Sequence, residues 1–74
     1  MEGATAIIYK LGHVIDGEEI ITNGYFNIEE CLTALDVAAY QNTNEAIERF
    51  FVAFAYVNED NEVLATEIHS GIDV

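Results

Sequence analysis

The sequence predicts an α+β fold of order β-β-α-β-β, a four-stranded antiparallel sheet with one amphipathic helix on one face. Three observations support this. Residues 50–57 are eight apolar residues in a row, mostly aromatic or β-branched, and a turn-forming segment follows them. An Asp-Gly pair near the N-terminus separates two other β-rich runs, which is the strongest short-range hairpin signal. Between these hairpins, residues 28–41 carry apolar side chains at helical spacing.

The first hairpin is expected to join residues 4–15 and 18–26 through a type I′ turn, which needs positive φ at both central residues. A two-residue turn sets these cross-strand partners: Ile15 with Glu18, His13 with Ile20, Leu11 with Thr22 and Ile7 with Phe26. One face would then hold Ile7, Tyr9, Leu11, Ile20 and Phe26, and the other Ile8, Lys10, Val14, Ile21, Asn23 and Tyr25. Gly12 and Gly24 are candidate bulge positions that would shift this register.

The helix is expected to begin after Asn27, a good N-cap, with Glu30 at the capping-box position. Its apolar stripe consists of Ile28, Cys31, Leu32, Leu35, Ala38 and Ala39. The Asn-Thr-Asn run at 42–44 should end it. Residues 45–49 are expected to form a further helical turn, and the alternative is a second helix over 43–52.

In the second hairpin, residues 50–57 are expected to pair with 63–68, and residues 70–74 to form a loose end. The strand over 50–57 is apolar on both faces, whereas one helix can cover only one face of a sheet. Exposed apolar patches usually mark interaction sites, so a homodimer is expected, formed by packing of sheet faces or by edge pairing into a continuous sheet. The interface residues predicted for it are Phe50, Val52, Phe54 and Tyr56. The alternative is that residues 45–49 and the C-terminus cover this patch.

Length and composition indicate a single domain over residues 1–74. The hydrophobic fraction of 51% is too high for a disordered acidic tail. The single cysteine, Cys31, has no partner for an intramolecular disulfide, whereas small secreted domains are usually rich in disulfides. No segment has the pattern of a signal peptide or the length of a membrane span. We therefore expect a cytoplasmic protein.

Charge is the most unusual feature, because 14 acidic residues stand against two basic ones, giving a net charge of −12. This balance argues against direct binding to nucleic acid or to an anionic membrane. The acidic residues cluster at both expected hairpin tips and at the helix start: Asp16, Glu18, Glu19, Glu29, Glu30, Glu59, Asp60 and Glu62. Each cluster alone is common at turns and helix N-termini. The near absence of lysine makes the total unusual and predicts that these residues bind a basic partner.

Catalytic and metal-binding patterns are absent from the sequence. His13, His69 and Cys31 lie on separate expected elements and lack the close pairing of zinc ligands. Residues 58–62 are acidic but too short for an EF-hand calcium loop. Cys31 lies on the apolar stripe of the helix, where cysteine usually acts as a small hydrophobe. We expect a non-enzymatic protein without a metal or cofactor.

In size, acidity and lack of catalytic motifs, the chain resembles small inhibitors made by phages and other mobile elements, which include DNA mimics, anti-restriction proteins and anti-CRISPR proteins. The resemblance covers composition only and assigns no residue a role. It implies an inhibitor of a host defence complex that binds a basic, nucleic-acid-binding surface. Two alternatives stay open: an oligomer that binds or sequesters a small molecule in an apolar groove, and a small subunit of a larger assembly.

Overall fold

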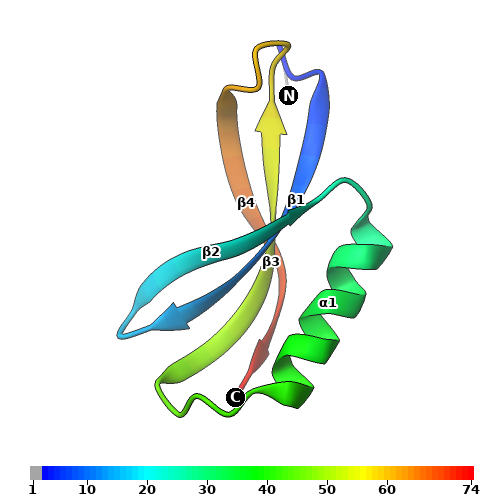
Figure 1. Ribbon diagram of the computed structural model, residues 1–74. Coiled ribbons are helices and arrows are strands. Elements are labelled where there is room, and N and C mark those ends of the chain that lie inside the picture. Colours follow the sequence, from blue (N-terminus) through cyan, green and yellow to red (C-terminus); the bar gives the residue numbers. More distant parts are fainter. Residues whose placement is uncertain (1–2) are drawn as a thin grey trace.

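A computed structural model describes residues 3–74 and has the predicted element order and fold class. The elements are β1 (Ala6–Ile15), β2 (Glu18–Tyr25), α1 (Ile28–Gln41), β3 (Ile47–Val57) and β4 (Val63–Asp73). The four strands form one antiparallel sheet of order β2-β1-β3-β4. The sheet is strongly twisted, and α1 runs along one side of it (Figure 1).

The two hairpin turns lie at opposite ends of the sheet. Central strands β1 and β3 are antiparallel, so that Ala6 pairs with Val57 and Ile15 pairs with Ile47. The β1–β2 turn therefore lies beside the start of β3, and the β3–β4 turn lies beside the start of β1 (Figure 1). At the usual rise per strand residue, the length of β1 separates the two turns by about 30 Å.

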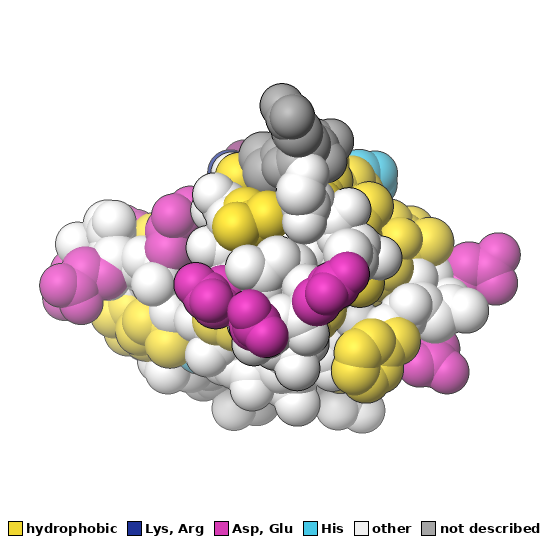
Figure 2. Space-filling view, turned by 90° about the horizontal axis from the view of Figure 1, so that it is seen from above, with side chains coloured by type: hydrophobic (Ala, Val, Ile, Leu, Met, Phe, Trp, Pro, Cys, Tyr) yellow, Lys and Arg dark blue, Asp and Glu magenta, His cyan; other side chains and the backbone are white. Residues whose placement is uncertain are grey.

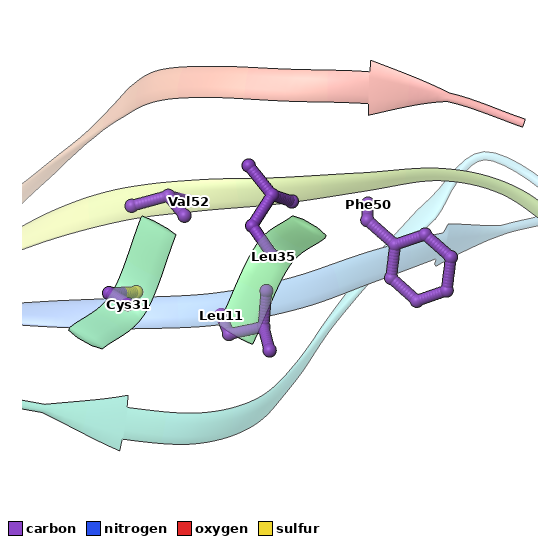
Figure 3. Packing of buried hydrophobic residues seen from close by; sticks show 5 residues of the cluster. All are labelled: Leu11, Cys31, Leu35, Phe50 and Val52. Carbon is purple, nitrogen blue, oxygen red and sulfur yellow. The ribbon is translucent and has the colours of Figure 1, made fainter. Parts of the chain in front are cut away.

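The main core lies between α1 and the sheet. It contains five buried side chains from α1, β1 and β3, namely Leu11, Cys31, Leu35, Phe50 and Val52 (Figure 3). Asn27 caps the helix as predicted, because its side-chain oxygen accepts hydrogen bonds from the backbone N–H groups of Glu29 and Glu30. The apolar stripe of α1 packs against the face of β3 that carries Phe50 and Val52.

The first hairpin has the predicted turn and part of the predicted register. Asp16 and Gly17 have φ values of 52° and 78°, and Ile15 pairs with Glu18 and His13 with Ile20. The predicted Leu11–Thr22 pair is wrong, because a register shift between Leu11 and Gly12 pairs Leu11 with Asn23. The shift was expected at Gly12, but no shift occurs at Gly24. Because of the shift at Gly12, Tyr25 packs against the core beneath the helix, on the face opposite to the predicted one.

The connection between α1 and β3 contains no second helix, so both helical expectations for residues 43–52 are wrong. The side-chain oxygens of Asn42 and Asn44 accept hydrogen bonds from the backbone N–H groups of Asn44 and Ala46. Such local bonds compete with helical ones and favour turns. Strand β3 then begins at Ile47, directly after this turn.

The C-terminus is also not the predicted loose end, because β4 continues to Asp73. Ile72 pairs with Phe50 and packs against the helix-side core. Two register shifts, between Val52 and Ala53 and between Tyr56 and Val57, allow β4 to follow the full length of the twisted β3. The apolar side chain of Ile72 thus completes the core at the end of the sheet where β3 begins.

Candidate interaction surfaces

The β1–β2 turn carries a cluster of exposed carboxylates, which we call the first acidic tip: Asp16, Glu18, Glu19 and Glu48. The first three were predicted. Glu48 joins them because the register shift in β3 leaves it unpaired with β1, and its Oε2 accepts a hydrogen bond from the backbone N–H of Gly17 at 3.2 Å. Sequence reasoning missed Glu48, since its place depends on pairing across 31 residues of chain.

The β3–β4 turn forms a second acidic tip, made of Glu59, Asp60 and Glu62. The side-chain oxygen of Asn58 fixes its backbone by accepting from the N–H groups of Asp60 at 2.9 Å and Glu62 at 3.0 Å. All three acidic residues are exposed. Viewed towards this end of the sheet, acidic side chains gather at the centre and lie also at both margins, with hydrophobic patches between them (Figure 2).

The helix start contributes the remaining predicted acidic residues, Glu29 and Glu30. Both are exposed, and their backbone N–H groups are bonded to Asn27. A carboxylate in the first turn of a helix is favoured by the helix dipole, so this pair has a structural role as well.

The eight predicted acidic residues thus occupy three separate sites. Within residues 3–74 the one ion pair joins Arg49 and Asp73, with 3.4 Å between Nε and Oδ1, so no basic side chain neutralises any of the eight.

The predicted interface residues of β3 are divided between two environments. Phe50 and Val52 lie in the core beneath α1. Phe54 and Tyr56 follow on the same face and are half-buried. The ring of Phe54 lies edge-on to Tyr9, with centroids 5.3 Å apart, and the hydroxyl of Tyr56 donates to Oε1 of Glu67 at 2.6 Å. This face of the sheet is therefore largely occupied within the chain.

The opposite face of the sheet, which we call the open face, carries no helix. Its central row on β3 is nevertheless buried: Phe51, Ala53, Ala55 and Val57 are at most 5% exposed. Side chains of β1, β2 and β4 border the small alanines and form a groove of about 600 Å³. The groove is lined by Lys10, Glu19, Ile21, Phe51, Ala53, Ala55, Val63, Thr66, Glu67 and Ile68. On this side the structure confirms that β3 is apolar on both faces and that one of these faces has no helix over it.

The candidate metal and nucleophile residues do not converge. Cys31 is fully buried in the core, and this burial raises the pKa of its thiol. The ring of His13 packs edge-on to Phe50, and the ring of His69 packs against Phe54 on another strand. In the part of the chain that the structure describes, no three His, Cys, Asp or Glu side chains group as metal ligands would.

Across residues 3–74, no helix has the length and apolar character needed to cross a membrane. Comparison of the chain with protein-family models, with curated proteins and with solved structures found no match.

Proposed function

We propose that this protein is a small non-enzymatic inhibitor that binds the basic, nucleic-acid-binding surface of a host defence complex and so takes the place of DNA or RNA. The observation that carries the proposal is the pair of acidic tips, which hold seven exposed carboxylates at the two ends of the sheet, none of them in an ion pair within residues 3–74. The inhibitor would act in the host cytoplasm if a phage encodes it.

The spacing of the tips supports nucleic-acid mimicry. They are separated by about 30 Å along β1, and one turn of B-form DNA measures about 34 Å. Strands β1 and β3 pair along their whole length between the tips. The free protein therefore holds the spacing already, and binding would require little additional ordering of the chain.

Electrostatics give the interaction a recognisable signature. A net charge of −12 attracts a basic surface over the distance of a Debye length and accelerates encounter. Exposed carboxylates at the rim of an interface contribute mainly to association rate and to salt dependence. Binding should thus weaken as salt is added.

The inhibitor is further proposed to be a homodimer. A two-fold dimer would present each tip twice, and doubling the binding sites strengthens attachment to an extended basic groove if both copies can engage it at once.

The test is capture of partners from host lysate by the immobilised protein, followed by elution with duplex DNA. Proteins that bind through a nucleic-acid groove should be released by DNA and not by an uncharged polymer. The variant Glu18→Lys with Glu59→Lys, with one change at each tip, should capture at least about tenfold less. The control Asp36→Lys with Glu45→Lys changes the net charge equally at exposed positions outside both tips and the groove, and it should capture normally. Equal capture by both variants would contradict the proposal.

A further inference from the structure

Both basic residues of the chain lie on the open face. Lys10 pairs with Ala53, and Arg49 pairs with Val14, so both side chains share the face of Phe51, Ala53 and Ala55. The pairing Glu19–Val14–Arg49–Asp73 across the sheet places two acidic strand residues on this face as well. With Glu67, which also lines the groove, two basic and three acidic residues lie on or border the open face, whereas the tips and the helix start carry acidic groups alone.

Neither basic group is fully paired within its own chain. In the described part of the chain, Lys10 makes no ion pair, although 13 carboxylates belong to residues 3–74. Its ammonium lies 3.8 Å from where a Cβ of Gly24 would be, so the side chain extends across β2 at the edge of the groove. The guanidinium of Arg49 covers Gly71, and its buried Nε forms no hydrogen bond despite the nearby Asp73.

The rim of the open face is apolar. Ile21 on β2 is 50% exposed, and on β4 Val63 and Ile68 are 56% and 48% exposed. They border the groove floored by Phe51 and the alanines of β3. The open face therefore combines an apolar groove with Lys10, which makes no ion pair within residues 3–74, and with Arg49, whose Nε forms no hydrogen bond.

We propose that the open face binds the open face of a second copy of this chain, which deepens the homodimer part of the proposed function. A second copy would supply a carboxylate for Lys10, which makes no ion pair within residues 3–74, and a hydrogen-bond acceptor for Arg49 in addition to Asp73. A basic partner would instead favour the acidic tips, and a nucleic acid or an anionic membrane would be repelled by the rest of the molecule.

The architecture of the open face also fits a second copy. It is the side of the four-stranded antiparallel sheet that α1 does not cover, and Ile21, Val63 and Ile68 on its rim are about half exposed. Face-to-face packing is the usual arrangement of two antiparallel sheets that each have an uncovered apolar face.

The test is the mass of the isolated protein, measured by sedimentation equilibrium over a range of concentrations. The expected result is a dimer of twice the 8.2 kDa chain mass. Ile68→Glu places a charge on the half-exposed rim and should raise the dimer dissociation constant by at least about tenfold. Val37→Glu is the matched control, because Val37 is 46% exposed on the helix and the Ile68 and Val37 changes add the same charge. Circular dichroism melting should show both variants folded.

Lys10→Gln should also weaken the dimer, since it removes a cation that the second copy neutralises. A monomeric wild-type chain, an unchanged dimer in folded Ile68→Glu, or equal weakening by Val37→Glu would overturn the proposal. If Ile68→Glu fails to fold, an unchanged dimer in Lys10→Gln would overturn it. Added salt should strengthen the dimer by screening repulsion between two acidic chains, whereas it should weaken partner binding at the tips. The dimer and the binding of a partner by the acidic tips are therefore tested independently, because the mass is measured without any partner.

Discussion

Gly12 lies directly against the ring of Phe51, such that a Cβ atom on Gly12 would be 2.6 Å from Cζ of Phe51 and 2.6 Å from the carbonyl oxygen of Ile20. Both neighbours are fixed, one as a buried ring and the other as backbone. Gly12→Ala should therefore lower the free energy of unfolding by about 1–3 kcal/mol, the usual range for overpacking. Urea denaturation followed by circular dichroism measures this loss.

Gly24 provides the control for this change. A Cβ there would meet Ile8 at 3.7 Å, which is ordinary van der Waals contact. Gly24→Ala should leave stability nearly unchanged or raise it, since alanine restricts the unfolded chain. Equal stability of Gly12→Ala and the wild type would show that Phe51 does not pack on β1 as described.

Cys31 should react slowly in the folded protein. Burial removes the thiol from solvent and raises its pKa, so little thiolate is present at about pH 8. A chromogenic disulfide reagent should modify one thiol per chain rapidly in denaturant and at least about a hundredfold more slowly without it. Cys31→Ala serves as the blank. Rapid modification of the folded protein would contradict the position of Cys31 beneath the helix.

Tyr56 should ionise at a higher pH than an ordinary tyrosine. Its hydroxyl donates a hydrogen bond to Glu67, which is the main cause of its raised pKa; desolvation and the charge of Glu67 add to it. The fold thus favours the neutral phenol. The stability it contributes is present below the ordinary pKa of about 10 and is lost as the pH rises through the raised value.

The difference in phenolate absorbance between the wild type and Tyr56→Phe isolates the titration of Tyr56. Replacing the partner by Glu67→Gln should move the midpoint of this difference curve down towards about 10. A midpoint that does not move in Glu67→Gln would show that the hydrogen bond is not the cause.

Salt should stabilise the fold. With a net charge of −12 and one ion pair within residues 3–74, repulsion among carboxylates opposes compaction. The melting temperature should therefore rise by several degrees between about 20 mM and about 500 mM NaCl, where screening becomes strong. Asp36→Lys with Glu45→Lys reduces the magnitude of the net charge and should show a smaller rise. A melting temperature that falls with salt would mean that attractive pairs dominate the surface.

Local signals in the sequence predicted most of the fold. The Asp-Gly turn, the Asn27 cap and the apolar run of β3 each act over a few residues, and each appears in the structure as predicted. Two of the wrong predictions have different causes, one local and one at long range. The residues after Gln41 form a turn because Asn42 and Asn44 bind their own backbone, and the C-terminus is ordered because Ile72 pairs with Phe50.

The candidate surfaces were harder to predict where they depend on the pairing of distant strands. The acidic tips follow directly from turn positions, and only Glu48 was missed. The location of Lys10 and Arg49 on one face depends on the pairing of β1 with β3, which the sequence does not specify. A one-residue change of register moves every side chain of a strand to the other face, as Tyr25 shows.

The salt dependence of partner binding shows whether the acidic tips hold the partner. For a partner captured from lysate, affinity should be measured at about 50 mM and about 300 mM NaCl with the wild type, the tip variant Glu18→Lys with Glu59→Lys, and the control Asp36→Lys with Glu45→Lys. Wild-type affinity should fall by at least about tenfold over this range, the tip variant should bind weakly with a shallower salt dependence, and the control should follow the wild type. Salt-independent binding, or equal effects of the two variants, would contradict binding by the acidic tips.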